Sequence, residues 1–177
     1  MSLEMIDLVG VGPREAILDV GGGAAPLAGS LLGRGFEDVS VLDLSQQGLS
    51  AAAQALGAEG SRVEWIRADI LDWSPPRTYG LWHDRAVLHF LVDARSRARY
   101  RETLLAALRP GGHVVVGTFA EDGPARCSGL PVARYDAEAL AGVFGPGFAT
   151  VARSRDEHST PSGARQAFTW LALRRRD

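Results

Sequence analysis

The 177-residue chain contains no lysine, so all 19 of its basic residues are arginines, and it contains one cysteine, Cys127. One cysteine excludes an internal disulfide, and no group of cysteines and histidines has the spacing of zinc ligands, so no metal site is expected. With 19 basic and 21 acidic residues the net charge is −2. This balance argues against a nucleic-acid-binding surface spread over the whole protein, and the single cysteine favours a cytoplasmic location.

Long hydrophobic runs are also lacking. No apolar stretch could span a bilayer, and the first residues do not follow the basic-then-apolar order of a signal peptide, so no membrane association is expected. The composition, 46% hydrophobic and 23% charged, is typical of a globular protein. The length favours a single domain over residues 1–177, and nothing in the sequence indicates an oligomeric state.

Short apolar runs alternate with helical patterns, which predicts an α/β fold with a doubly wound, mostly parallel sheet. Seven strands are expected, over residues 16–20, 39–43, 63–68, 80–84, 113–119, 149–155 and 167–174. Helices are expected over residues 26–33, 46–56, 94–108 and 137–144, with N-caps at Ser45 and Asp136, and a turn at 110–112. A polar loop at 158–163 joins the last two strands, which predicts a closing antiparallel hairpin.

A glycine-rich turn follows the first predicted strand. The strand carries Asp19 near its end, the turn is Gly21–Gly22–Gly23, and a helix starts at Pro26. Glycines allow the backbone to bend sharply and to approach a ligand closely, and the free N–H groups at the helix start face the bound group. The sequence therefore predicts a strand, turn and helix that cradle a ligand.

Acidic residues end the next two predicted strands. Asp43 follows the glycines by about 20 residues, where a carboxylate can accept hydrogen bonds from ribose hydroxyls, and Asp69 ends the third strand. With Asp19, these acids line one edge of the sheet. Such a cleft suits a ligand with an ammonium group and sugar hydroxyls, whereas it would repel a pyrophosphate.

In these motifs the chain resembles the class I S-adenosylmethionine-dependent methyltransferases over nearly its whole length. Residues 19–25 look like the family's first motif, although Ala25 stands where a third glycine is common. Residues 41–45 resemble the strand end at which the family binds ribose, and residues 68–70 resemble the motif whose acid contacts adenine. Residues 108–116 match the family's leucine-arginine-proline-glycine-glycine run before the fifth strand. The resemblance implies a Rossmann-like sheet of order 3-2-1-4-5-7-6 with the last strand antiparallel, here with a reduced N-terminal lid.

The resemblance also implies S-adenosylmethionine as the cofactor and assigns one end of it to the glycine turn. Gly21, Gly22 and Gly23 would hold the methionine moiety, with Asp19 near its amino group. An NAD-binding Rossmann domain is the alternative, because Asp43 would suit its ribose equally well. However, the dinucleotide fingerprint needs a glycine at the place of Pro26.

The resemblance assigns the adenosine end to the next two strands. Asp43 would bind the ribose diol, Leu44 would pack on the adenine ring, and Asp69 with the backbone of Ile70 would contact the adenine edge.

The fourth predicted strand carries the candidate catalytic residues. Strand alternation sends His83 and Arg85 to one face of the sheet and Trp82 and Asp84 to the other. We expect Asp84 to contact the acceptor or the cofactor and Arg85 to bind an anionic acceptor group; a turn-stabilising Asp–Arg pair is the alternative. His83 is a candidate general base or, alternatively, a hydrogen-bonded core histidine.

Residues 120–135 form a long, turn-rich connection, which is typical of either a substrate loop or a surface excursion. Tyr135 is expected to cap the substrate pocket. Cys127 is expected to be half-buried and inert.

These features favour an enzyme that moves a methyl group from S-adenosylmethionine to a small-molecule acceptor. No base-flipping motif follows the fourth strand, so a nucleic-acid acceptor is not expected. A protein acceptor is the alternative, because residues 84–86 loosely resemble the Asp-Lys-Gly turn of some lysine methyltransferases. A non-catalytic cofactor-binding module is the alternative of another class, because only residues 1–15 precede the first predicted strand.

Overall fold

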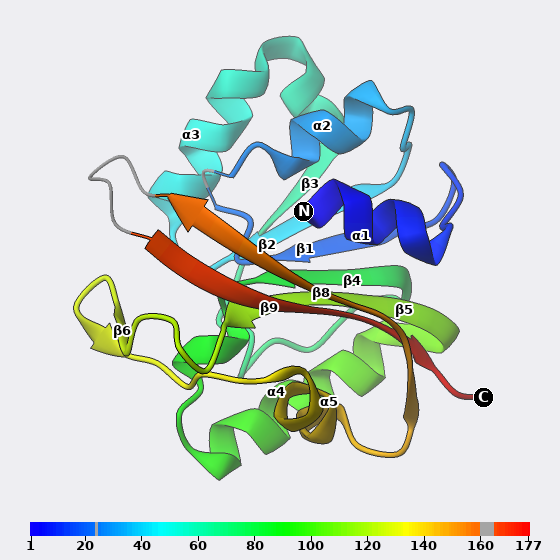
Figure 1. The fold of residues 1–177 in the computed structure, drawn as a ribbon. Helices are drawn as coiled ribbons and strands as arrows, with labels where there is room; N and C mark the ends of the chain where they lie inside the picture. The colour runs from blue at the N-terminus through cyan, green and yellow to red at the C-terminus, as the bar shows by residue number, and fades with distance from the viewer. Residues whose placement is uncertain (24, 160–164) are drawn as a thin grey trace.

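A seven-stranded sheet with helices on both faces forms the protein in a computed structural model that describes residues 1–23, 25–159 and 165–177 (Figure 1). The strand order is β3-β2-β1-β4-β5-β9-β8. The strands of this sheet are β1 (Ile17–Val20), β2 (Val39–Asp43), β3 (Val63–Arg67), β4 (Tyr79–Arg85), β5 (Leu108–Phe119), β8 (Phe148–Ser159) and β9 (Arg165–Arg175).

The pairing of the strands confirms the predicted topology. Strands β1 to β5 pair in parallel, and β9 pairs antiparallel with both β5 and β8. The expected order 3-2-1-4-5-7-6 is therefore correct, with β8 and β9 as its sixth and seventh strands.

Two strand boundaries differ from the expected ones by more than two residues. Strand β5 begins at Leu108 instead of residue 113, because the irregular segment with Gly111 at φ 69° still lets Leu108 pair with Tyr79. Strand β8 extends to Ser159, into the region expected to be a loop. The rest of that loop, residues 160–163, and Ala24 of the glycine motif lie outside the described residues.

Two groups of helices cover the sheet. Helices α4 and α5 lie on one face, whereas α1, α2 and α3 lie on the other (Figure 1). Their bounds are α1 (Ser2–Val9), α2 (Leu27–Gly33), α3 (Gln46–Leu56), α4 (Ala94–Ala107) and α5 (Ala137–Phe144). Two 3₁₀ helices, η1 (Gly57–Arg62) and η2 (Leu88–Phe90), and a small hairpin of β6 (Arg126–Cys127) and β7 (Leu130–Pro131) complete the described elements.

Local sequence explains where the helices begin. The side chain of Ser45 accepts a hydrogen bond from the Gly48 backbone at 3.0 Å, and that of Asp136 accepts one from Ala139 at 2.7 Å, so both predicted N-caps are confirmed. Helix α1 was not predicted. It forms because its Met5 side chain is 1% exposed against the sheet, so tertiary packing stabilises a short segment.

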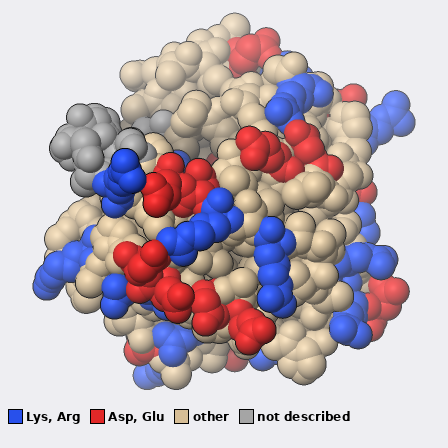
Figure 2. Space-filling model, viewed as in Figure 1, with Lys and Arg blue, Asp and Glu red and all other residues tan. Residues whose placement is uncertain are grey.

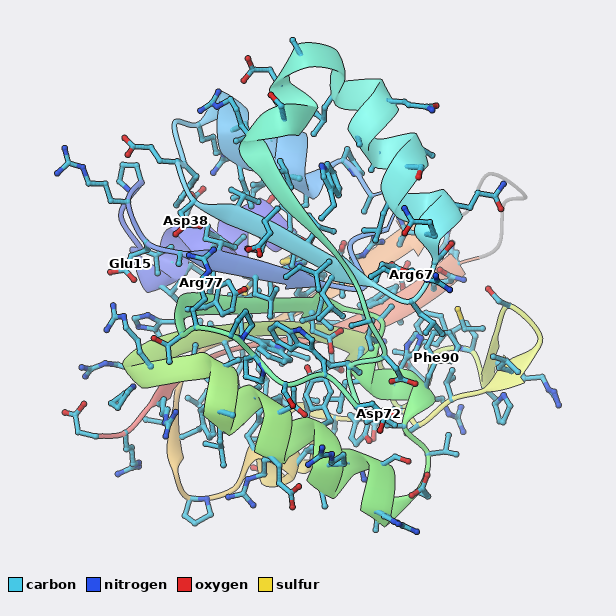
Figure 3. All side chains as sticks on the ribbon, turned by 180° about the vertical axis from the view of Figure 1, so that it is seen from behind. Glu15, Asp38, Arg67, Asp72, Arg77 and Phe90 are labelled. Atoms are coloured by element: carbon cyan, nitrogen blue, oxygen red, sulfur yellow. The ribbon has the colours of Figure 1, made fainter. Side chains whose placement is uncertain are left out.

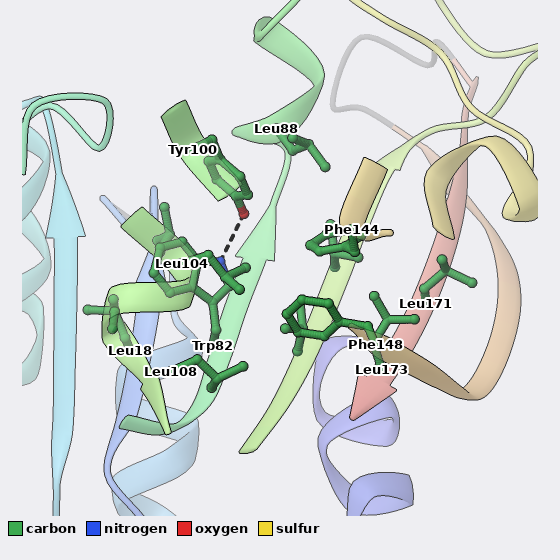
Figure 4. Packing of buried hydrophobic residues seen from close by; sticks show 14 of the residues in the cluster. Leu18, Trp82, Leu88, Tyr100, Leu104, Leu108, Phe144, Phe148, Leu171 and Leu173 are labelled. Atoms are coloured by element: carbon green, nitrogen blue, oxygen red, sulfur yellow. Dashed lines mark hydrogen bonds between the residues drawn. The ribbon is translucent and has the colours of Figure 1, made fainter. Parts of the chain in front are cut away.

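Apolar side chains fill both layers between sheet and helices. In the layer under α4 and α5, Trp82 and Tyr100 meet edge to face with ring centroids 5.5 Å apart, and the Trp82 Nε1–H donates to the Tyr100 hydroxyl at 2.8 Å (Figure 4). The alternation predicted for β4 is therefore confirmed, because Trp82 faces this layer while Leu81 faces the other.

An ion pair closes the edge of the sheet where the parallel strands begin. Arg77, ahead of β4, donates two hydrogen bonds of 2.6 Å to Asp38, ahead of β2 (Figure 3). The same guanidinium lies 4.7 Å from the ring of Tyr79. Side-chain contacts within the protein thus connect the amino ends of the parallel strands. The cavities lie at the carboxyl ends of these strands.

Within the described ranges, no helix combines the length and the apolar composition that crossing a bilayer needs. In the same ranges no three or more His, Cys, Asp or Glu residues gather as metal ligands would.

Candidate functional site

The glycine turn follows β1 at the carboxyl edge of the sheet. Gly21 has φ 70°, and a Cβ added there would lie 2.1 Å from Cγ2 of Val87. A Cβ on Gly22 would lie 2.3 Å from Oδ2 of Asp19. No side chain fits at these two positions without displacing its neighbours, so the turn exposes bare backbone to whatever lies beside it.

Two cavities meet at this turn. The first, of about 590 Å³, extends over the ends of β2 and β3, and we call it the strand-end cavity. The second, of about 720 Å³, lies between the sheet and the start of α1, and we call it the sheet-face cavity. Both are lined by Val20, Gly21, Arg85 and Ala86, so a ligand could extend from one cavity into the other past the glycines.

Two carboxylates and mostly apolar walls form the strand-end cavity. Asp43 accepts a hydrogen bond from the Ser45 backbone at 2.7 Å, and Asp69 accepts one from the Leu71 backbone at 2.9 Å, each through Oδ1. In the described part of the chain, the second oxygen of each carboxylate has no hydrogen-bond donor. These oxygens could accept hydrogen bonds from ligand hydroxyl or amino groups.

The apolar walls of this cavity include Leu44, whose side chain is 69% exposed, and the buried Ile70. Further apolar lining comes from the chain around η2 and from the β6–β7 hairpin, through Val87, Phe90, Leu91, Val92, Leu130 and Pro131. A flat, largely apolar ring with a few polar edges would fit between such walls.

A buried histidine and aromatic rings form the floor of the sheet-face cavity. Nδ1 of His83 lies 2.6 Å from Oδ1 of Asp19, and both side chains are 3% exposed. The ring of His83 is 6.3 Å from that of Trp170. Arg85 reaches the same cavity with its guanidinium 5.3 Å from the ring of Phe168.

Asp84 lines neither cavity. Its carboxylate is completely buried and accepts hydrogen bonds from the Tyr100 hydroxyl at 2.6 Å and from the backbones of Val87 and Leu88 at 2.8 and 3.1 Å. Burial raises the pKa of Asp84 to about 6, against the hydrogen bond from Tyr100. The geometry does not support the expected contact with acceptor or cofactor, because Asp84 points to the opposite face of β4 from Arg85.

The expected cap residue, Tyr135, also lies outside both cavities. Its side chain is 8% exposed and belongs to the core under α5, while its carbonyl oxygen accepts a hydrogen bond from the Thr169 hydroxyl at 2.7 Å. Other residues of the same connection line the cavities: the partly buried Cys127 on one side and Leu130 on the other. The connection therefore contributes through its hairpin and not through Tyr135.

The sequence interpretation did not predict several residues that line the sheet-face cavity, including two groups with different origins. Residues 1–4 at the start of α1 border the sheet-face cavity, and Trp170 of β9 lies in its floor. The buried pair Met5 and Ile6 is a weak helical signal that could have indicated α1. No local signal indicated Trp170, because an apolar residue in a central strand is usually a core residue.

Comparisons of the sequence with known proteins find similarity to methyltransferases. A family model described as a methyltransferase domain matches residues 17–112. The chain is 32% identical over 118 residues to the methyltransferase tpcM of Aspergillus fumigatus and 27% identical over 96 residues to nodulation protein S of Rhizobium fredii. These alignments cover 67% and 54% of this chain, but only 32% and 54% of the two relatives.

Solved structures share the whole fold. The N-methyltransferase NodS of Bradyrhizobium japonicum superposes with a TM-score of 0.77 at 19% identity, covering 99% of this chain and 94% of that one. The 1,6-didemethyltoxoflavin-N1-methyltransferase of Burkholderia thailandensis, solved with its substrate and S-adenosylhomocysteine, gives 0.73 at 20% identity, covering 99% and 80%.

Proposed function

The chain belongs to the methyltransferase domain family, and from this premise we propose that it transfers a methyl group from S-adenosylmethionine to a small-molecule acceptor. The observation that carries the proposal is the bare glycine turn at the junction of two cavities. One cavity suits a nucleoside, and the other has room for the amino-acid end of the cofactor beside Asp19 and for an acceptor.

The residues of the strand-end cavity fit an adenosine. Asp43 would accept hydrogen bonds from the ribose hydroxyls through its unpaired oxygen, and Leu44 would cover one face of the adenine ring. Asp69 and the backbone of Ile70 would contact the polar edge of that ring. A carboxylate that gains ligand hydrogen bonds of this type typically contributes about 1.5–3 kcal/mol per bond.

The glycine turn and Asp19 fit the amino-acid end of the cofactor. The backbone of Gly21, Gly22 and Gly23 would lie along the methionine moiety, since side chains at Gly21 and Gly22 would collide with Val87 and Asp19. Asp19 lines the sheet-face cavity, although His83 already occupies one of its oxygens. When bound, the cofactor supplies a methyl carbon that a positively charged sulfur makes electrophilic.

The sheet-face cavity is the proposed acceptor site. Its volume is in the range of small-molecule pockets, and α1, α2 and the β6–β7 hairpin all contribute to its walls. Arg85 would bind an anionic group of the acceptor, because it stacks on Phe168 and has no carboxylate partner within the described chain. The structural relative solved with bound 1,6-didemethyltoxoflavin supports a small-molecule acceptor.

Calorimetric titration with S-adenosylhomocysteine tests the cofactor site. We expect Asp43→Ala to weaken binding by roughly tenfold or more, because the ribose would lose a charged hydrogen-bond acceptor. The control is Glu59→Ala, which removes an acid from η1, outside both cavities, and should leave the affinity unchanged. Unchanged binding by Asp43→Ala would contradict the proposed cofactor orientation.

Methyl-labelled S-adenosylmethionine and cell extract test the acceptor class. Label in the metabolite fraction is expected. Label confined to the protein fraction would instead favour a protein acceptor. Cofactor binding without label in either fraction would favour a non-catalytic binding module.

A further inference from the structure

The wall of the sheet-face cavity contains a buried hydrogen bond between Asp19, which also lies at the proposed cofactor site, and His83. Asp19 and His83 lie opposite each other in the register of β1 and β4, and their Oδ1 and Nδ1 atoms are 2.6 Å apart. A carboxylate can only accept in this hydrogen bond, so Nδ1 of His83 carries the proton. In the neutral tautomer that this hydrogen bond selects, Nε2 keeps its lone pair.

Among the described residues, that second nitrogen has no hydrogen-bond partner. Nε2 of His83 is buried and forms no hydrogen bond with any described residue, although His83 lines the sheet-face cavity. The cavity wall next to it also includes Gly21 and Arg85, at the junction with the strand-end cavity. An unpaired buried acceptor is unfavourable, so a ligand with an O–H or N–H group would gain free energy by donating to it.

His89 shows that burial alone does not create this arrangement. Both of its ring nitrogens lack hydrogen-bond partners in the described part of the chain. The ring centroid is 4.5 Å from that of Phe90 and 4.7 Å from that of Phe119, and His89 lines neither cavity. Burial lowers the pKa of His89 to about 4, so it stays a neutral core residue at neutral pH. His83 differs because it has both an orienting carboxylate and a neighbouring cavity.

We propose that His83 is the general base of the methyl transfer, positioned by Asp19, and that the acceptor is a small molecule with an uncharged amine or hydroxyl as its nucleophile. This inference rests on the proposed function. The acceptor's lone pair forms a bond to the methyl carbon while the carbon–sulfur bond breaks and leaves its electron pair on sulfur. The proton of the attacking N–H or O–H moves to Nε2 of His83.

The charge balance explains the role of Asp19. The positive charge leaves the sulfur and ends on the imidazolium of His83, which the buried Asp19 carboxylate stabilises at 2.6 Å. The proton returns to water once the product has left. An acceptor nucleophile without a hydrogen, such as a tertiary amine, would not need this base.

The ring nitrogens can be observed directly by NMR of ¹⁵N-histidine-labelled protein, with and without S-adenosylhomocysteine. At pH 7 we expect His83, assigned by its loss in His83→Gln, to carry a proton on Nδ1 and none on Nε2. Asp19→Asn should abolish this preference. A proton on Nε2 in the wild-type protein would overturn the proposal.

Kinetics test the same role. With primary amines and phenols as acceptor probes and release of S-adenosylhomocysteine as the signal, His83→Gln should lower kcat about 100-fold or more on every probe that the wild-type protein methylates. We expect the wild-type rate to fall at acid pH, because a proton on Nε2 removes the base, whereas the residual rate of His83→Gln should lack this fall and its affinity for S-adenosylhomocysteine should remain. A wild-type kcat for His83→Gln would overturn the proposal.

Controls separate this inference from the proposed function. His113→Gln changes a histidine at the other end of the sheet, outside both cavities, and should behave as wild type. Asp19→Asn is the second variant if His83→Gln does not fold. Its kcat is measured at saturating S-adenosylmethionine and should be reduced, because Asp19 also lies at the proposed cofactor site and its affinity for the cofactor can change independently. If the wild-type protein methylates none of the probes, the NMR experiment alone tests whether Nε2 of His83 is free to accept a proton. Failure of the wild-type protein to bind S-adenosylhomocysteine would contradict the proposed function and not the tautomer of His83.

Discussion

Asp84 lies in β4 with its carboxylate bonded to Tyr100 and to the backbone of Val87 and Leu88. Val87 lines the strand-end cavity and abuts Gly21, and the intervening Ala86 has an unusual φ of 72°. A residue without glycine's freedom holds such a conformation only where its surroundings enforce it. We therefore interpret Asp84 as a positioning residue that fixes the wall between the two cavities.

Asp84 also predicts a pH effect on stability. Its pKa is about 6 in the folded protein, against 3.8 for an ordinary aspartate, so between these values the folded state binds more protons than the unfolded state. Stability from this group is therefore present at low pH and is lost as pH rises toward 7, by about 3 kcal/mol. In urea unfolding, the difference in unfolding free energy between wild type and Asp84→Asn should change by about 2 kcal/mol from pH 4 to 7, since part of the effect falls below pH 4. Parallel curves would contradict the prediction.

Gly21 is the second residue whose exact identity matters. Gly21→Ala combines strain at φ 70° with a contact of 2.1 Å to Val87, and we expect it to weaken S-adenosylhomocysteine binding by roughly tenfold or more. Trimming the neighbour in Gly21→Ala/Val87→Ala should restore part of the affinity, because only the backbone strain remains. Calorimetry measures both variants. No loss in the single variant would show that the turn tolerates a side chain.

At the scale of elements, the short segments depend on what they contact. The pattern of residues 46–56 and the N-cap Ser45 are enough to predict α3, whereas α1 has no side-chain cap and is stabilised by the sheet face beneath it. The β6–β7 hairpin is similar. The sequence of residues 126–131 indicates only a turn-rich connection. In the structure, Cys127 lines the sheet-face cavity, and Leu130 and Pro131 line the strand-end cavity.

Helix α1 provides a prediction with an internal control. Met5→Ala should destabilise the protein by about 2–5 kcal/mol, because its 1% exposed side chain would leave a cavity between helix and sheet. Leu8→Ala, in the same helix but 61% exposed, should change the stability by less than about 0.5 kcal/mol. Urea unfolding of both variants measures the difference. Equal effects would mean that α1 is not held by burial of Met5.

At the scale of the whole molecule, the two ends of the parallel strands differ: ion pairs lie at the amino ends and the cavities lie at the carboxyl ends. Figure 3 shows Asp38, Arg77 and Glu15 at one end of the sheet and Phe90 at the other. The first end is closed by the Asp38–Arg77 ion pair and by a 2.9 Å contact between Glu15 and Arg109. The other end carries the glycine turn and both cavities, as is usual for parallel sheets.

The surface charge bears on the kind of ligand that the protein attracts over long distances. On the face shown in Figure 2, acidic and basic side chains alternate over short distances without a large patch of one sign. A mixed surface of this kind gives little long-range attraction for a polyanion.

The sequence alone determined the mostly parallel sheet with its closing hairpin and the places of Asp43 and Asp69, because apolar runs, caps and strand-end acids are local patterns. The order of the strands came from the resemblance to a known family and not from these patterns. It could not decide what Asp84 and Tyr135 do, since strand alternation says which face a side chain takes but not whether that face holds a cavity or a packed core. Only the tertiary structure placed Trp170 from the end of the chain beside His83. It also brought Asp19 to within 2.6 Å of that histidine, a contact between strands 64 residues apart that no local spacing encodes.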